Sequence, residues 1–237
     1  MENNILVCEG LTKNYGRKNA LNNVTLTLPA GRMVGLLGPN GSGKTTFLKL
    51  IAGFLTPSQG TVQVCGEVPG VLTKRMVSYL PDRLALEKYQ RVFHILHFYE
   101  DFFDDFNSEK AMHMLEDLEI EPRQRLSSMS KGMLEKVQLI LTMSREAKLY
   151  LLDEPLGGVD PAARDYILNT ILRNYNEDST VIFSTHLISD VEKILDDAIF
   201  LKEGTVQMYK SVDEIRTECS KSLDELFREV FQCSKSF

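Results

Sequence analysis

The feature that most constrains this chain is a glycine-rich loop between two apolar segments, in the run GRMVGLLGPNGSGKTTFLKLI that starts at Gly31. The segment before the loop is typical of a buried strand, and Phe47, Leu48 and Ile51 after it share one side of a helix. Three glycines within six positions are costly, because each loses roughly 0.5–1 kcal/mol in a regular element. Bare backbone lets N–H groups approach a chain of phosphates, and the start of the next helix adds positive charge. The run therefore predicts an anion site.

The loop also fits a complete nucleotide-binding pattern. Its residues match GxxxxGK[ST], the P-loop: Gly38, Pro39, Asn40, Gly41, Ser42, Gly43, Lys44 and Thr45. In that pattern Lys44 reaches the β- and γ-phosphates, Thr45 offers its hydroxyl to Mg²⁺, and Thr46 helps to hold the phosphates. The alternative is a glycine-rich turn with a chance lysine, and the strand and helix on either side argue against it.

Two later strands end in side chains that suit the same chemistry. The apolar run KLYLLDEP ends in Asp153 and Glu154, at the carboxyl end of what we expect to be a parallel strand. There Asp153 would hold Mg²⁺ through water, and Glu154 would orient an attacking water. His186 follows the run STVIFSTH, whose end points toward the same edge. The alternatives are an acidic turn that ends a strand and a structural histidine.

A second anion site is predicted at the start of another helix. In the run MSKGM, Ser130 suits a helix N-cap and Gly132 again offers bare backbone, with Lys131 between them. One chain with one P-loop needs a single phosphate site, so this second site makes sense if it acts on nucleotide held by another copy. The alternative is a plain N-cap.

Strands alternate with helices along the chain, which predicts a mostly parallel central sheet. A helical insert interrupts this order over about residues 84–122, where Val92, Leu96, Tyr99, Phe103 and Phe106 recur at helical spacing. Near the end we expect a hairpin that turns at Glu203 and Gly204, followed by a tail from residue 211 with one amphipathic helix, SLDELFREVF.

Composition limits the class of protein. The 237 residues suffice for one large α/β domain or two small lobes, and no apolar run approaches the ~18–20 residues of a membrane helix. The start lacks the layout of a signal peptide, so we expect the chain to stay in the cytoplasm. None of the four cysteines forms a CxxC pair, which argues against a zinc or disulfide framework. The net charge of −6 argues against a general nucleic-acid binder.

These motifs, in this order, resemble the ATP-binding cassette (ABC) ATPase family over about residues 5–209. SKGM resembles a variant signature of bacterial export ATPases, and residues 156–161 match the family's D-loop, with Asp160 as its acidic residue. Tyr15 falls where the family stacks an aromatic ring on adenine, and His186 matches the switch histidine that contacts the γ-phosphate. The resemblance implies a P-loop NTPase fold with an N-terminal antiparallel β subdomain, and a helical subdomain at about residues 84–145. Together these would form a domain over residues 1–210, followed by a short helical tail over residues 211–237.

The resemblance also implies how the chain works. Two copies would form a head-to-tail dimer, with each ATP and its Mg²⁺ between the P-loop of one copy and residues 130–132 of the other. Hydrolysis, with Glu154 as general base, would release the dimer and drive an integral membrane permease made of separate chains. The ATPase would be cytoplasmic and peripheral on the inner face of the membrane, as a homodimer or a heterodimer. The chain looks closest to ATPases of small bacterial exporters, often encoded beside a GntR-type regulator. Any exposed part of its aromatic stripe would line the groove for a permease helix.

Two positions depart from the family pattern. Asp82 stands where the family has a glutamine, so it could bind Mg²⁺ but could not donate a hydrogen bond to the attacking water. Met133 also replaces a glutamine, which is a milder change. Two other functions stay open at this point. One is an ABC ATPase without a transport role, such as a cofactor-assembly scaffold, and the other is a nucleotide-binding module that has lost catalysis.

Overall fold

An antiparallel sheet forms from the first two strands and one later strand. The computed structural model describes residues 4–83, 86, 89–157, 159, 161–176, 178–219 and 221–232, without the side chains of residues 162, 163, 219 and 232. Strand β1 (Asn4–Tyr15) lies between β2 (Lys18–Pro29) and β4 (Gln59–Val64). Both pairings are antiparallel. Along β2 buried and exposed residues alternate from Val24 to Leu28, as expected for a sheet with one face on the core.

The second sheet carries the predicted motifs. Its order is β5 (Val77–Leu80), β6 (Leu149–Asp153), β7 (Thr180–Thr185), β3 (Met33–Leu37), β8 (Asp197–Lys202) and β9 (Thr205–Ser211). The first five strands are parallel, and β9 pairs antiparallel with β8. Every residue of β3, β6 and β7 is buried, which explains why their central residues are mostly apolar. The predicted mostly parallel sheet and N-terminal antiparallel sheet are confirmed.

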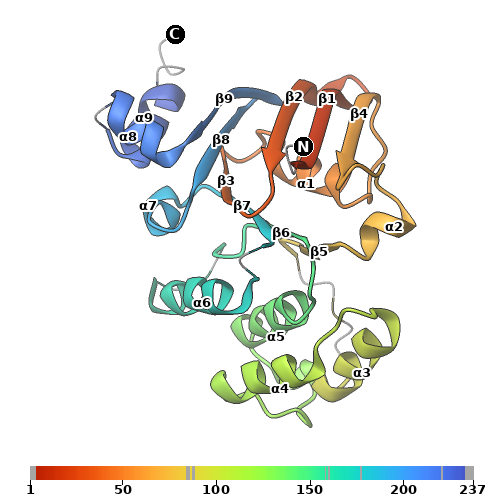
Figure 1. Ribbon diagram of the computed structural model, residues 1–237. Helices are drawn as coiled ribbons and strands as arrows, with labels where there is room; N and C mark the ends of the chain where they lie inside the picture. The colour runs from red at the N-terminus through yellow and green to blue at the C-terminus, as the bar shows by residue number, and fades with distance from the viewer. Residues whose placement is uncertain are drawn as a thin grey trace.

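Helix α1 (Lys44–Ile51) fills the space between the two sheets (Figure 1). Its side chains Phe47, Leu48 and Ile51 are buried in one cluster with residues of both sheets. A second cluster lies on the other face of the central sheet, where α6 (Pro161–Asn174) and the short α7 (Ile188–Val191) contribute. The central sheet is therefore covered on both faces, as a parallel sheet requires.

A helical region lies beyond the β5–β6 edge of the central sheet (Figure 1). It contains α3 (Val92–Phe102), α4 (Ser108–Asp117), the 3₁₀ turn η1 (Leu126–Ser128) and α5 (Lys131–Met143), with α2 (Val71–Lys74) near its edge. The aromatic stripe does not stay helical as far as Phe106, because α3 ends at Phe102 and Asp105 turns away to pair with buried Arg145 at 2.9 Å.

The tail corrects the expectation of one helix, because it contains two, α8 (Val212–Cys219) and α9 (Leu223–Gln232). The first was missed although its start carries a capping box. The Ser211 hydroxyl accepts a hydrogen bond from the Glu214 amide at 3.1 Å, and the Glu214 carboxylate accepts one from the Ser211 amide at 3.0 Å. The hairpin before the tail turns at Glu203 and Gly204 as predicted, with φ of 48° and 79°.

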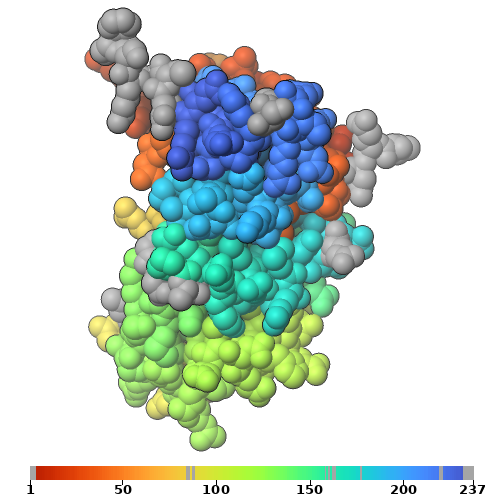
Figure 2. Space-filling view, turned by 90° about the vertical axis from the view of Figure 1, so that its left-hand side faces the viewer, coloured from red at the N-terminus to blue at the C-terminus, as the bar shows by residue number. Residues whose placement is uncertain are grey.

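The tail helices and the helical region lie at opposite ends of the molecule (Figure 2). In that view the tail helices (blue) gather at the top and the helical region (green) at the bottom, with α6 between them.

Among the described residues, no helix is both long enough and apolar enough to cross a bilayer. Cys8 is buried, which raises the pKa of its thiol to about 12, and neither Cys8 nor Cys65 forms a disulfide.

Candidate functional site

The predicted motifs meet in a pocket of about 610 Å³ at the carboxyl ends of β3, β6 and β7. Predicted site residues that line it are Tyr15, Asn40, Gly41, Gly43, Lys44, Thr45, Thr46, Asp82, Lys131, Glu154 and His186. Asp153 is buried at the end of β6 and accepts a hydrogen bond from Thr45 of the lining. Gly38, Pro39, Ser42, Ser130 and Gly132 do not line the pocket either. The fold thus brings together residues that are up to 171 positions apart, Tyr15 and His186.

The glycine-rich loop is fixed to its surroundings by close contacts that exclude a side chain. Gly43 has a φ of 111°, and a Cβ there would come within 2.4 Å of the Ala20 carbonyl oxygen. At Gly38 a Cβ would come within 2.3 Å of the Leu201 carbonyl oxygen. The Ser42 carbonyl accepts a hydrogen bond from the Gly204 amide at 2.9 Å, which ties the loop to the β8–β9 turn. No side chain caps α1, so its first N–H groups stay available to an anion.

Lys44 places its ammonium group at the centre of the loop. The side chain is buried, and its Nζ donates to the carbonyl oxygens of Gly38 at 2.8 Å and Pro39 at 3.3 Å. Nζ also lies 3.1 Å from Oε1 of Glu154, which makes an ion pair. A buried ammonium needs such partners, and a phosphate would compete with Glu154 for it.

Asp153 is held by three hydroxyl groups. Its Oδ1 accepts hydrogen bonds from Ser184 at 2.7 Å and Thr45 at 3.1 Å, and its Oδ2 accepts one from Tyr79 at 3.3 Å. Burial raises the pKa of Asp153, and the bonds from Ser184 and Thr45 oppose that rise. The Thr45 hydroxyl and the Asp153 carboxylate therefore lie side by side as oxygen ligands.

This pair fits Mg²⁺, which usually binds through one or two carboxylates together with the phosphates of a substrate. No cluster of three or more His, Cys, Asp or Glu side chains that could hold a metal by itself occurs in the part of the chain that the structure describes. The donor set is thus suited to a metal that arrives with a nucleotide.

Glu154 connects Lys44 to His186. Its Oε2 lies 2.9 Å from Nδ1 of His186, while Oε1 faces Lys44. The backbone of Glu154 has a left-handed φ of 49°, and its amide donates to the hydroxyl oxygen of Ser184 at 2.9 Å. The carboxylate is mostly buried but faces the pocket, where it could accept a proton from a water molecule.

The remaining predicted residues lie at the rim. Tyr15 ends β1 with 49% of its surface exposed, and the Lys13 ammonium lies 5.6 Å from its ring centroid. Asp82 lines the same pocket, and its negative charge is one of the smaller causes that raise the pKa of Asp153. Asp160, which the D-loop match singled out, lies outside the described residues.

The second predicted anion site is at the start of α5. The Ser130 hydroxyl accepts a hydrogen bond from the Met133 amide at 3.3 Å, so Ser130 is the N-cap that the sequence predicts. Ser130 and Gly132 are exposed and do not line their own chain's pocket. Lys131 does line it, and its ammonium pairs with Glu135 at 3.5 Å.

Sequence reasoning missed five residues of this site. Tyr79 and Ser184 hold Asp153, and Lys18, Ala20 and Glu135 line the pocket. A signal existed for Ser184, because it is a polar residue that follows the apolar run VIF and precedes His186 by two positions. Tyr79 gave no comparable signal, since a tyrosine in a half-buried strand is ordinary.

Comparison with known proteins decides the family. The sequence model described as ABC transporter matches residues 21–157, more than half of the chain. This chain belongs to the ABC transporter family. The resemblance stated from the motifs is thereby confirmed, and members of this family are ATPases.

Relatives of this ABC protein are ATP-binding proteins of transporters. An uncharacterized ABC transporter ATP-binding protein of Bacillus subtilis, YxlF, is 31% identical over 90% of this chain and 73% of its own length. The lantibiotic transport ATP-binding protein SrtF of Streptococcus pyogenes is 26% identical, over 94% of this chain and 96% of its own. The linearmycin resistance ATP-binding protein LnrL of B. subtilis is 28% identical, over 84% of this chain and 67% of its own.

A solved structure of the ATP-binding subunit of an ABC transporter superposes on this chain with a TM-score of 0.86. It is 28% identical, and the match covers 95% of this chain and 99% of the other. The ABC ATPase fold therefore extends through nearly all of this chain, in agreement with its two sheets and helical region.

Proposed function

We propose that this chain binds and hydrolyses ATP with Mg²⁺ and powers export through a permease made of separate chains. The observation that carries the proposal is the contact chain Lys44–Glu154–His186 beside the pair Thr45–Asp153. These groups supply, within one pocket, a cation for phosphates, oxygen ligands for a metal and a carboxylate facing solvent. The names of the relatives SrtF and LnrL, on lantibiotic transport and linearmycin resistance, support an export role.

Each residue has a distinct part in the reaction. When ATP binds, the Lys44 ammonium leaves Glu154 and pairs with phosphate oxygens. The amides of the glycine-rich loop donate hydrogen bonds to the same phosphate oxygens. Thr45 and Asp153 would hold Mg²⁺, which neutralises charge on the phosphates. Glu154 orients a water molecule and takes its proton on a carboxylate oxygen. His186 holds Oε2 of Glu154 at 2.9 Å and thereby fixes the orientation of that carboxylate. Asp82 lines the same pocket, where its carboxylate would add a further oxygen ligand for the metal and its negative charge would repel the phosphates.

A second copy completes the nucleotide site in this proposal. Ser130 and Gly132 are exposed at the start of α5, and a Cβ on Gly132 would meet nothing within 4 Å. Such a surface suits the phosphates of ATP bound to a second subunit. Since one chain carries all the catalytic groups, we propose a homodimer, and a heterodimer with a related ATPase would use the same surface.

The membrane partner would dock in a groove of about 290 Å³ between the sheet edge and α3. Phe54, Tyr99 and Phe102 line it, and Phe54 and Phe102 are 60% and 67% exposed. A short cytoplasmic helix of a permease would bury these rings, because exposed aromatic patches mark interaction sites. The ATPase would then sit on the inner face of the membrane. A permease and a GntR-type regulator encoded beside this chain would fit the same proposal.

The test of the proposed reaction is the substitution Glu154→Gln. Glutamine keeps the size of the side chain but cannot take a proton, so we expect ATP binding to persist while turnover falls by about 10²–10⁴-fold. Steady-state phosphate release and equilibrium binding of ATP measure the two effects. Glu109→Gln, at an exposed position in the first turn of α4, serves as the matched control and should keep wild-type turnover. Wild-type turnover in Glu154→Gln would remove Glu154 from the role of general base.

A further inference from the structure

Tyr79 lies between two cavities that the proposed function treats separately. It belongs to β5, which pairs in parallel with β6, and its phenol oxygen reaches Oδ2 of Asp153 at 3.3 Å. A tyrosine hydroxyl is protonated at neutral pH and donates to an ionised carboxylate. Tyr79 also lines a different cavity, the groove of about 290 Å³ beside α3. Tyr79 thus lines the groove and, through its hydroxyl, contacts the carboxylate next to the nucleotide pocket.

The bond to Asp153 matters because the two carboxylate oxygens have different partners. Oδ1 is held by Ser184 and Thr45, and Oδ2 by Tyr79. Once Thr45 turns to a metal, Ser184 and Tyr79 are the two hydroxyl groups left to orient the carboxylate. Groups that hydrogen-bond to a metal ligand in this way set the orientation and basicity of that ligand.

On the groove side, Phe54 supports the tyrosine ring. The two ring centroids are 5.3 Å apart at an angle of 50°, a tilted aromatic pair. Phe102 lines the same groove but stacks instead on Phe98, with centroids 5.7 Å apart. A molecule that fills the groove and moves Phe54 therefore acts on the ring whose hydroxyl holds Asp153.

We propose that Tyr79 is a positioning residue that connects the groove beside Phe54 to the metal-binding carboxylate of Asp153. The proposal rests on the proposed function, in which Asp153 holds Mg²⁺. It assigns to the phenol the role of fixing the orientation of the Asp153 carboxylate that would hold the metal. It also makes the Phe54 ring the element through which an occupant of the groove alters metal binding.

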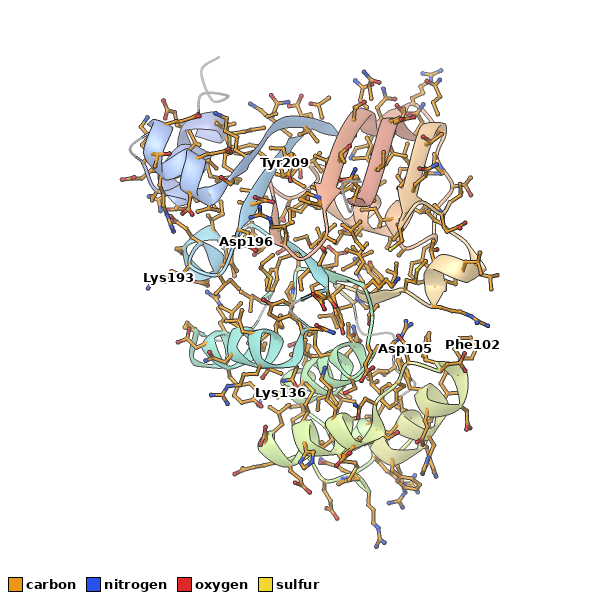
Figure 3. The ribbon with its side chains drawn as sticks, in the orientation of Figure 1. Phe102, Asp105, Lys136, Lys193, Asp196 and Tyr209 are labelled. Atoms are coloured by element: carbon orange, nitrogen blue, oxygen red, sulfur yellow. The ribbon has the colours of Figure 1, made fainter. Side chains whose placement is uncertain are left out.

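The first test is Tyr79→Phe, which removes the hydroxyl and keeps the ring. Mn²⁺ is titrated in the presence of a non-hydrolysable ATP analogue and followed by electron paramagnetic resonance. We expect Mn²⁺ to bind about tenfold more weakly, which is the lower end of the loss seen when a metal ligand loses a hydrogen-bond partner. The affinity for the analogue without metal should not change. Tyr209→Phe is the matched control, because the Tyr209 hydroxyl also donates to an aspartate, Asp197, at 3.3 Å. Tyr209 lies on β9, far from α3 and Phe102 (Figure 3).

The second test addresses the groove. Phe54→Ala removes the support of the Tyr79 ring and should weaken Mn²⁺ binding. Phe98→Ala, which removes a phenylalanine of similar exposure outside the groove, should not. Equal Mn²⁺ affinity in wild type and Tyr79→Phe would overturn the proposal, and an effect in Tyr79→Phe without one in Phe54→Ala would overturn its connection to the groove. Failure of the wild-type chain to bind Mn²⁺ with the analogue would instead contradict the proposed function.

Discussion

At the scale of single residues, the site depends on backbone conformations that side chains rarely adopt. Glu154 has a left-handed φ of 49°, which costs an L-residue roughly 1–2 kcal/mol. Its amide is held by both the hydroxyl and the carbonyl oxygen of Ser184, at 2.9 and 3.0 Å, and these bonds maintain the conformation. The strain places the carboxylate between Lys44 and His186. A conformation kept at some cost at a reactive position is typical of functional sites.

The loop offers a sharper test at the same scale. Gly43→Ala adds a Cβ that collides with the Ala20 carbonyl oxygen at a left-handed position, so we expect the free energy of unfolding to fall by about 2–4 kcal/mol. Urea denaturation measures the change. Gly132→Ala is the matched control, because a Cβ there meets nothing, and alanine in a helix is favoured by about 0.5–1 kcal/mol over glycine. Equal stability of Gly43→Ala and wild type would show that the loop does not need bare backbone at Gly43.

At the scale of elements, one buried arginine fastens the helical region to the central sheet. Arg145 follows α5 and forms a bidentate pair with Asp105, while its guanidinium also donates to the carbonyl oxygens of Val77 and Lys74. Its guanidinium carbon lies 4.0 Å from the ring centroid of Phe103. These contacts join the α3–α4 connection to the start of β5. The position of the groove beside Tyr79 therefore depends on Arg145.

Removing that side chain tests this connection. Arg145→Ala leaves the Asp105 carboxylate without its partner, and breaking a buried pair costs about 3–5 kcal/mol in the free energy of unfolding. Chemical denaturation, followed by circular dichroism, measures the loss. Arg216→Ala removes an arginine whose ion pairs are partly exposed at 3.6 Å, and it should cost about 1 kcal/mol or less. Equal losses in the two variants would contradict the role of Arg145 as the fastening residue.

At the scale of the whole molecule, the sequence predicts what is local and misses what depends on strand order. The P-loop, the acidic end of β6 and the Ser130 N-cap are contiguous patterns, so their residues were identified directly. Tyr79 meets Asp153 only because β5 and β6 are neighbours, across 74 residues of sequence. Ser184 lies directly opposite Asp153 in the register of β6 and β7. Spacing along the sequence does not predict such pairings, because they depend on which strands are neighbours in the sheet.

The tail shows the other kind of miss, because its signal was present. The run SVDE at residue 211 has the same pattern as SLDE at residue 222, and both form capping boxes before a helix. From the sequence alone, only the second predicts an amphipathic helix, because α9 has the stronger apolar stripe. Phe227 and Phe231 of that stripe pack on Phe200 of β8, with ring centroids 5.6 and 5.9 Å away. The tail helices therefore belong to the core beneath them.

The central claim at this scale is that ATP is bound between two copies of the chain. The direct measurement is the molar mass of Glu154→Gln by light scattering with and without saturating ATP. We predict that ATP doubles the mass from the 26.9 kDa of one chain, and that Lys44→Ala, which cannot hold the phosphates, stays at the mass of one chain. A Glu154→Gln chain that binds ATP and keeps the mass of a single copy at every protein concentration would contradict the account.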